Sequence, residues 1–311
     1  MITASPPLRG TSTLCSVTSS RGRLYAAIAR LSAHLPPFRG RTRVFLALYR
    51  ALRLEQQHVI VRASLKQPVP YEATLDLHAW AQRVAYLTGG YEAKTTRFLM
   101  ELRKGEGYLL DVGANVGLIA IPFARATGAR VFAVEAVPDN AAVLRANVEA
   151  NQLAGQITVL ELGLGDEGKL VDIQIEGDLR AGEGTGTANI LPDGSQYECV
   201  RQTLRIERLD DLELPRGCSV IKIDTDGYDL KVLQGGRAFL ERERPAILGE
   251  FSAHCLAWHG QTLDDVIAFA KELRYDVLAT SHRAAFVEDL LLIPVETRER
   301  FTLPPGFSSL T

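Results

Sequence analysis

The sequence lacks long apolar runs, closely spaced cysteines and any large excess of charge. No run of about 18 apolar residues occurs in the 311-residue chain, so we predict no membrane-spanning helix. The four cysteines form no CxxC pair, which excludes a CxxC zinc or redox motif and is typical of reduced thiols in a cytoplasmic protein. A formal net charge of −2 gives no reason to expect a nucleic-acid partner.

Acidic residues are missing from one segment, residues 1–54, which holds nine arginines and no lysine. This composition resembles that of organelle transit peptides, but we favour a basic leader followed by helices that pack on the main domain. Residues 23–35 and 43–54 have the apolar spacing of helices. A third alternative is that these basic amphipathic helices lie on a membrane surface.

The composition as a whole is that of a globular protein, with 46% hydrophobic and 23% charged residues. Short strands at 58–63 and 71–77 flank a turn and predict a β-hairpin. Strands and helices then alternate, which predicts an α/β fold with a mainly parallel sheet and helices on both faces. We therefore expect four regions: a flexible basic leader at 1–20, N-terminal helices and the hairpin at 21–86, the main domain at 87–303 and a loose tail at 304–311.

Apolar patterning gives the order of elements in the main domain. The expected helices are at 95–103, 118–126, 138–151 and 263–273. A further helix is expected to follow the strand at 220–224 and to end at about residue 240. The expected strands are at 107–112, 129–135, 157–162, 170–175, 200–206, 220–224, 246–251, 276–279 and 286–293. The glycine-rich connection at 176–198 is too long for a simple spacer, so we predict a lid over the bound acceptor substrate. A plain solvent-exposed loop is the alternative.

A glycine turn follows the first strand of the alternating region. The segment Asp111-Val-Gly-Ala-Asn-Val-Gly117 joins a buried strand to a helix. Gly113 permits a tight turn and the close approach of a ligand, and Gly117 lets the helix begin against the strand. Amides at the start of such a helix bind carboxylates, so the methionine carboxylate of S-adenosylmethionine would suit them.

Glu135 ends the next strand, 24 residues after Asp111, where a carboxylate can accept from both hydroxyls of an adenosine ribose. The ribose does not distinguish a methyl donor from NAD. NAD sites favour a second glycine where this chain has Asn115, and Asp111 would repel a pyrophosphate but accept from an ammonium group. These residues favour S-adenosylmethionine over a dinucleotide, and a strand–helix turn without a ligand is the remaining alternative.

A second group of acidic residues follows the strand at 220–224. Asp224, Asp226 and Asp229 come together near Gly227, at the sheet end that also carries the glycine turn. Crowded carboxylates raise one another's pKa and can provide a general base. Asp229 could instead stabilise the first turn of the next helix. A calcium loop and a magnesium ion held by Asp224 are further alternatives, although we expect no metal.

Glu250 ends the next strand on the same edge of the predicted sheet, and His254 and His259 follow in the loop. Histidine is a natural base at neutral pH, so we place His254 with Asp224 and Asp226 as the catalytic candidates. A surface-loop position is the alternative for both histidines.

Together these motifs are similar to those of the FkbM-type methyltransferases, over roughly residues 87–294. The matching elements are Gly90-Tyr-Glu92, the DVGANVG turn at 111–117, Glu135 with Pro138 and Asn147, Gly163-Leu-Gly-Asp166, Thr203 to Leu212 with Asp210 and Asp211, Lys222 to Asp229, Val232 to Gly235, Arg244-Pro245 and Glu250. The chain departs from the family at Asp226 and Asp229, where glutamate is usual, and at Glu161, where asparagine is common.

The resemblance implies a class I methyltransferase fold, which is a Rossmann-like, seven-stranded sheet with one antiparallel strand. It also implies S-adenosylmethionine as cofactor, S-adenosylhomocysteine as product, and O-methylation of a hydroxyl on a sugar or secondary metabolite. The positions assigned to the cofactor are Asp111, Gly113, Ala114, Asn115, Gly117, Glu135, Ala136, Gly163, Asp166 and Asp224.

In this assignment the glycine turn holds the methionine half of the cofactor, Glu135 holds the ribose and Asp166 approaches the adenine. Asp224 lines the transfer point, and Asp226 or His254 takes the proton of the acceptor hydroxyl. The expected partner is a small-molecule or glycan acceptor, with no nucleic acid and no stable membrane insertion. Two rival functions stay open, namely a nicotinamide-dependent oxidoreductase and a donor-binding protein without turnover.

Overall fold

The N-terminal region forms two helices and a hairpin, as the sequence predicts. Helices α1 (Ser20–Ser32) and α2 (Arg41–Ala51) precede an antiparallel pair, β1 (Ile60–Leu65) and β2 (Tyr71–Asp76). No helix within the described ranges is long and apolar enough to cross a membrane. Most of the expected leader lies outside those ranges, because the computed structural model of the chain describes residues 20–32, 40–54, 59–176, 188–189, 199–280, 289–301 and 307–310.

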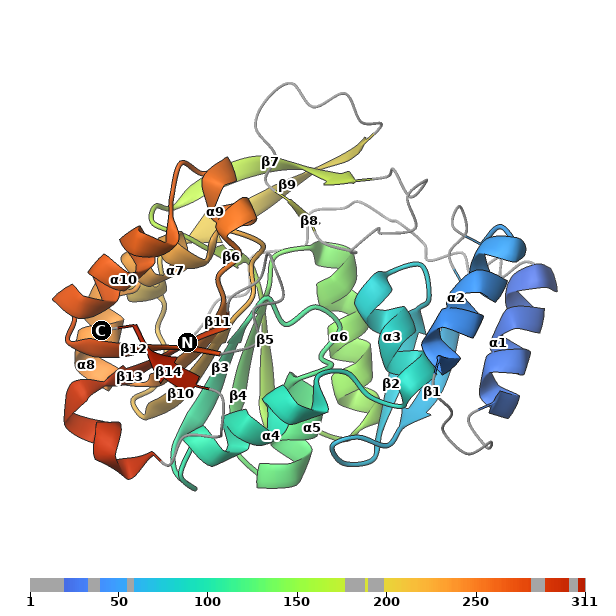
Figure 1. Ribbon diagram of the computed structural model, residues 1–311, viewed down its shortest axis with the longest axis horizontal. Coiled ribbons are helices and arrows are strands. Elements are labelled where there is room, and N and C mark those ends of the chain that lie inside the picture. The colour runs from blue at the N-terminus through green and yellow to red at the C-terminus, as the bar shows by residue number, and fades with distance from the viewer. Residues whose placement is uncertain are drawn as a thin grey trace.

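The main sheet has eight strands in the order β14-β12-β13-β11-β10-β3-β4-β5 (Figure 1). Five neighbouring strands, from β11 to β5, are parallel. The chain leaves β3 for β4 on one side and returns to β10 on the other, so the carboxyl ends of β3 and β10 flank the point where such sheets bind ligands. The parallel strands are β3 (Tyr108–Val112), β4 (Val131–Glu135), β5 (Ile157–Glu161), β10 (Cys218–Ile223) and β11 (Ala246–Glu250).

The other edge of the sheet is antiparallel. It consists of β12 (Tyr275–Thr280), β13 (Asp289–Pro294) and β14 (Phe307–Ser309). β13 runs antiparallel to both β11 and β12, which confirms the predicted class I arrangement. The eighth strand is a difference from the expectation, because β14 comes from the segment predicted as a loose tail. Its pairing satisfies backbone groups that an open edge of β12 would otherwise leave to solvent.

Helices cover both faces of this sheet, so the strands are apolar on both sides. Leu109 lies in one buried core and Leu110, the next residue, lies in the other. Successive strand residues point to opposite faces, which explains the near-continuous apolar runs of these strands. The helices are α4 (Ala93–Leu102), α5 (Ala120–Thr127) and α6 (Pro138–Ala150) on the first face, and α7 (Asp229–Gly235), α8 (Arg237–Glu243) and α10 (Leu263–Glu272) on the second.

A smaller sheet with the order β6-β9-β7-β8 lies along one side of the main sheet (Figure 1). β7 and β9 pair antiparallel, which confirms the two strands predicted at 170–175 and 200–206. Most of the connection between them, predicted as a lid, lies outside the described residues. The strands are β6 (Gly163–Leu164), β7 (Lys169–Glu176), β8 (Ala188–Asn189) and β9 (Cys199–Glu207).

Two short helices, α3 (Trp80–Thr88) and α9 (Ala253–Trp258), are absent from the sequence prediction. α3 begins without a side-chain cap, and its end is marked by Gly89 at a φ of 81°. α9 has six residues and buries only Leu256 among its side chains. Helices this short carry too few apolar positions for a helical period to stand out. Both matter for the site, because Trp80 of α3 and His259, the residue after α9, line the cavity described below.

The β-hairpin is fixed to the main domain by two asparagines of α6. Asn147 accepts from the amide of Thr74 at 2.7 Å and donates to Thr74 O at 3.2 Å and to Val116 O at 3.0 Å. Asn151 makes the same pair of bonds with Glu72, at 2.9 and 2.7 Å. Each side-chain amide therefore pairs with β2 as a neighbouring strand would. Asn147 also ties the hairpin to the glycine turn.

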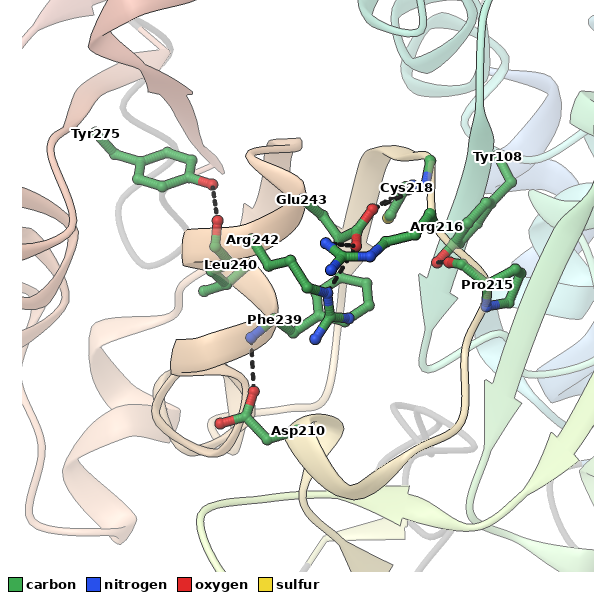
Figure 2. Close-up of polar contacts among 11 residues, drawn as sticks. Tyr108, Asp210, Pro215, Arg216, Cys218, Phe239, Leu240, Arg242, Glu243 and Tyr275 are labelled. Carbon is green, nitrogen blue, oxygen red and sulfur yellow. Dashed lines mark hydrogen bonds and ion pairs between the residues drawn. The ribbon is translucent and has the colours of Figure 1, made fainter.

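Far from the switch point, carboxylates fix α8 against the start of β10 (Figure 2). Glu243 accepts from the amides of Gly217 and Cys218 at 2.8 and 3.4 Å. Asp210 accepts from the amide of Phe239 at 2.7 Å, in the first turn of α8. Such bonds satisfy amides that have no partner within a helix or strand. Asp210, one of the family-like residues, is therefore a structural residue.

Candidate active site

A cavity of about 270 Å³ opens at the carboxyl ends of the parallel strands, at the switch in strand order between β3 and β10. An excess of negative charge in a concave site favours a ligand with net positive charge. S-adenosylmethionine carries a sulfonium and an ammonium against one carboxylate, whereas the pyrophosphate of NAD is anionic. Arginine is absent from the described lining, and its charged residues are Asp111, Glu135, Asp224, Asp226, Glu250 and Lys222.

The glycine turn after β3 packs directly on the turn after β10. Gly113 has a φ of 82°, and a Cβ atom at this position would lie 1.9 Å from the carbonyl oxygen of Asp224. Only glycine allows this backbone conformation at such a close approach. The amide of Gly113 donates to Val134 O at 3.0 Å, which also joins the turn to β4. The turn is thus a rigid floor between three strands.

The amides of Leu118 and Ile119 are the turn's free anion-binding groups. Both residues line the cavity, and neither amide has a hydrogen-bond acceptor among the described residues. They precede α5, whose N-terminus favours an anion. The expected carboxylate site is therefore at the two residues directly after Gly117. The earlier amides are occupied: Gly113 and Ala114 donate to Val134 O, Asn115 to Glu135, Val116 to Asn115 Oδ1, and Gly117 to Ala114 O.

Glu135 ends β4 and is buried, with 6% of its surface exposed where it meets the cavity. Its carboxylate accepts from the amides of Asn115 and Val137 at 2.8 and 2.9 Å, and from Asn140 Nδ2 at 3.5 Å. Burial raises the pKa of Glu135, and the bonds from Val137 and Asn115 oppose this rise. A carboxylate has about four acceptor positions, so these bonds leave capacity for a ligand hydroxyl.

Asp111 is fully buried in β3, and neither of its carboxylate oxygens has a hydrogen-bond partner within the described structure. Lys222 lies beside it in register on β10 and donates to Asp224 Oδ2 at 2.9 Å. Burial raises the pKa of Asp111 to about 6, and the Lys222 charge and the nearby backbone amide of Ala120 oppose this rise. The Ala120 amide does not reach hydrogen-bond geometry, so both carboxylate oxygens remain without a full hydrogen bond. A buried carboxylate without partners is unfavourable, and the ammonium group of a ligand would supply the missing bonds.

The turn after β10 presents Asp226 to the cavity. Asp229 is fully buried and accepts from Thr225 N, Thr225 Oγ1 and Gly227 N, each at 2.9 Å. Asp229 therefore holds the turn, in agreement with the alternative of a helix-cap role. Asp226 has a φ of 49° and lines the cavity. Burial and the neighbouring Asp224 raise the pKa of Asp226 to about 7. A carboxyl with this pKa exchanges protons at neutral pH.

The structure separates the two candidate histidines. His254 lies on an exposed position of α9 and packs its ring against Trp258, with centroids 5.1 Å apart. It is not among the residues that line the cavity, whereas His259 and Glu250 are. His259 packs edge-on against Tyr228 at 5.0 Å, and burial, with Lys231, lowers its pKa. The unpredicted helix α9 is the physical reason, because it turns His254 outward.

The remaining predicted cofactor positions differ in their placement. Gly117 does not line the cavity, and a Cβ atom there would lie 2.6 Å from Leu144 Cδ1, so this glycine serves the packing of the turn on α6. Asp166 is exposed, forms an ion pair with Lys231 at 3.9 Å and lies outside the lining. The other predicted positions in the lining are Ala114, Asn115, Ala136 and Gly163.

Several lining residues escaped the prediction. Trp80, at the start of α3, is 43% exposed and lines the cavity. Nothing in the sequence marks it, since α3 itself has no clear signal. Tyr91 and Lys222 lie within quoted family-like motifs, but no role could be assigned until the fold placed them beside Asp224. Burial, with nearby Glu92, raises the pKa of the Tyr91 hydroxyl.

The lining fits S-adenosylmethionine better than a metal. The partnerless carboxylate of Asp111, the free amides before α5 and the remaining acceptor capacity of Glu135 match the ammonium, carboxylate and ribose of the methyl donor. Among the residues that the structure describes, no group of three or more His, Cys, Asp or Glu side chains is arranged to hold a metal ion.

Comparison with known proteins gives a consistent result. The hexuronic acid methyltransferase AglP of Haloferax volcanii is 31% identical over 144 residues, which cover 46% of this chain and 56% of AglP. The chain thus spans little more than half of that relative's length. An FkbM methyltransferase structure from Methylobacillus flagellatus superposes with a TM-score of 0.42 at 19% identity, covering 60% of this chain and 44% of the other.

A structure of TYW2 from M. jannaschii in complex with AdoMet superposes with a TM-score of 0.40 at 14% identity, covering 77% of this chain and 88% of the other. The family comparison covers more than half of the chain, because the model of the methyltransferase FkbM domain matches residues 111–277. This range begins at Asp111 and includes the glycine turn, Glu135 and the turn after β10. The chain therefore belongs to the FkbM methyltransferase family.

Proposed function

We propose that the protein is an S-adenosylmethionine-dependent methyltransferase that methylates a hydroxyl oxygen of a sugar-like acceptor. The observation that carries the proposal is the acidic cavity, in which Asp111 is buried without a hydrogen-bond partner in the described structure beside the free amides of Leu118 and Ile119. This pairing suits a zwitterionic amino-acid group. The same acidity opposes a nicotinamide dinucleotide, which was the main rival.

The donor-holding residues follow from the chemistry of each group. Asp111 would accept from the methionine ammonium, and the amides before α5 would bind its carboxylate. Glu135 would accept from the ribose hydroxyls. Apolar lining near Gly163 and Val137 would receive the adenine. The bound donor supplies an electrophilic methyl group on its sulfonium. The protein's part is to place the acceptor oxygen in line with that group and to exclude water.

In this proposal, a residue of the turn after β10 removes the proton of the acceptor hydroxyl. Asp226 lines the cavity, and its raised pKa of about 7 lets it accept the proton of an acceptor hydroxyl near neutral pH. Lys222 holds Asp224 at 2.9 Å, which fixes that carboxylate beside the glycine turn. His259 replaces His254 as the second candidate base, because it lies in the lining.

We infer that the acceptor binds at the opening formed by Trp80 and Tyr91. Trp80 is 43% exposed yet belongs to the lining, so its indole offers an apolar face at the entrance. The C–H faces of a sugar ring pack well on such a surface, while its hydroxyls reach polar groups. The hexuronic acid methyltransferase of H. volcanii supports a sugar as acceptor class. Because the four cysteines are dispersed along the sequence, we still expect a cytoplasmic location.

A direct test combines donor binding with turnover. Calorimetry should show binding of S-adenosylhomocysteine and no comparable binding of NAD. Incubation with a methyl-labelled donor and a panel of neutral and acidic sugars should give a methyl ether in a product that depends on the acceptor. Tight binding of NAD without binding of S-adenosylhomocysteine would overturn the proposal. Donor binding with no labelled product from the whole panel would favour a binding protein without turnover.

A further inference from the structure

The two N-terminal helices carry an unusual share of the molecule's exposed apolar surface. Six large hydrophobic side chains in the described structure are exposed, and three of them belong to α1 and α2. Leu24 and Ile28 are 53% and 36% exposed and lie one helical turn apart on α1, and Val44 of α2 is 55% exposed. Figure 1 shows α1 at the outer end of the molecule, with α2 between it and α3.

These side chains are not needed to hold the helices in place. The buried side of α1 includes Tyr25, which packs edge-on against Phe45 and Tyr49 of α2 at 6.2 and 5.4 Å. The hydroxyl of Tyr86 on α3 donates to the carbonyl of Ala26 at 2.9 Å. The aromatic side of the pair therefore attaches it to the main domain. The aliphatic side faces solvent, which is unfavourable unless something covers it.

The charges carried by these two helices all have one sign. No acidic residue occurs anywhere in residues 1–54. Five exposed arginines lie on these helices or just after α2, and none of them forms an ion pair with another described residue. They are Arg21, Arg23, Arg43, Arg50 and Arg53. The surface thus combines aliphatic side chains of the size that insert between lipids with cationic groups that bind phosphate.

We propose that the outer side of α1 and α2 is a docking surface for an anionic lipid bilayer. Leu24, Ile28 and Val44 enter the interfacial region, and the arginines pair with acidic headgroups. The association is peripheral and reversible, in keeping with short helices. It attaches the protein to the bilayer through the end of the molecule that carries α1 (Figure 1).

Two other occupants fit the surface less well. A single-stranded nucleic acid would be expected to meet aromatic side chains for base stacking, but Tyr25, Phe45 and Tyr49 of these helices are buried. A symmetric contact with a second copy of the chain would bring two basic surfaces together, and like charges oppose such contact. A bilayer with acidic lipids satisfies both the exposed aliphatic groups and the arginines.

Vesicle sedimentation of the full chain tests the proposal. Vesicles of phosphatidylcholine with about one third phosphatidylserine should retain the protein, and pure phosphatidylcholine vesicles should not. Arg21→Gln with Arg43→Gln should weaken binding on the order of tenfold, because each arginine adds to the attraction of an anionic surface. Leu24→Ser with Ile28→Ser should weaken it similarly at unchanged charge. Rising salt should release the protein.

A matched control is Arg97→Gln with Arg300→Gln, which removes the same charge from exposed positions outside α1 and α2. This control should bind like the parent protein, and all variants should keep the parent's circular dichroism and S-adenosylhomocysteine affinity. Equal losses in the control and the test variants would overturn the proposal, as would binding to neutral vesicles. Preferential retention on RNA, or dimerisation that the Leu24 and Ile28 changes abolish, would also overturn it in favour of those occupants.

Discussion

Replacing Glu135 by glutamine should weaken binding of the methyl donor by about 10- to 150-fold. The carboxylate offers one oxygen to Asn115 N at 2.8 Å and the other to Val137 N at 2.9 Å. An amide keeps one acceptor and turns a donor toward the second N–H group, so Glu135→Gln also loses the charge offered to a ribose. Hydrogen bonds to a charged group contribute about 1.5–3 kcal/mol, which corresponds to that range of affinity.

Titration calorimetry with S-adenosylhomocysteine measures the effect, and thermal unfolding checks that the variant is folded. Glu161→Gln is a close control. Glu161 ends the neighbouring strand β5 in register with Glu135, yet it is exposed and paired with Arg145 at 2.6 Å outside the cavity. An exposed ion pair contributes about 0–1 kcal/mol, so donor affinity should stay unchanged. An unchanged dissociation constant for Glu135→Gln in a folded protein would refute the ribose assignment.

Three further predictions concern the base, the acceptor and the scaffold. Activity should rise with pH through about 7, because Asp226 accepts a proton only when ionised and burial raises its pKa. Asp226→Asn should lower kcat and remove this rise in activity with pH, and an unaltered pH profile of the variant would exclude Asp226 as the base. Trp80→Ala should raise the KM of the acceptor several-fold, with Trp80→Phe partly restoring it; a matching loss of donor affinity would move Trp80 to the donor site. Asn147→Ala should lower the free energy of unfolding by roughly 2–4 kcal/mol, because the amide of Thr74 and the carbonyl of Val116 lose their hydrogen-bond partner. Urea denaturation measures this change, and a change below about 0.5 kcal/mol would contradict the prediction.

The centre of the main sheet could be predicted because its strands β3, β4, β10 and β11 are buried on both faces and hold few polar residues. Asp111 interrupts such an apolar run, and it lies in the lining of the candidate site. The carboxyl ends of β3, β4 and β10 could be brought together from topology alone, since parallel strands end on one edge of the sheet. Glu135, Asp224 and Asp226 line one cavity as predicted.

What escaped prediction depends on elements with weak local signals. The short helix α9 turns His254 outward and leaves His259 at the cavity, an outcome that five residues of sequence spacing could not decide. Trp80 owes its position to α3, which begins without a side-chain cap. The strand β14 forms only because the edge of β12 is available to it. In each case tertiary contacts, rather than local propensity, fix the element.

Motif similarity alone does not separate residues that bind a ligand from residues that hold the fold, and hydrogen-bond satisfaction does. Asp229 and Asp210 have their carboxylate bonds filled by nearby amides, so their partners lie inside the protein. Asp111 is as deeply buried as Asp229 but has no such bond among the described residues. Since burial without a partner is unfavourable, we propose that the partner of Asp111 comes from outside the chain. Loss of Asp229 should therefore mainly reduce stability, whereas loss of Asp111 should mainly reduce donor binding.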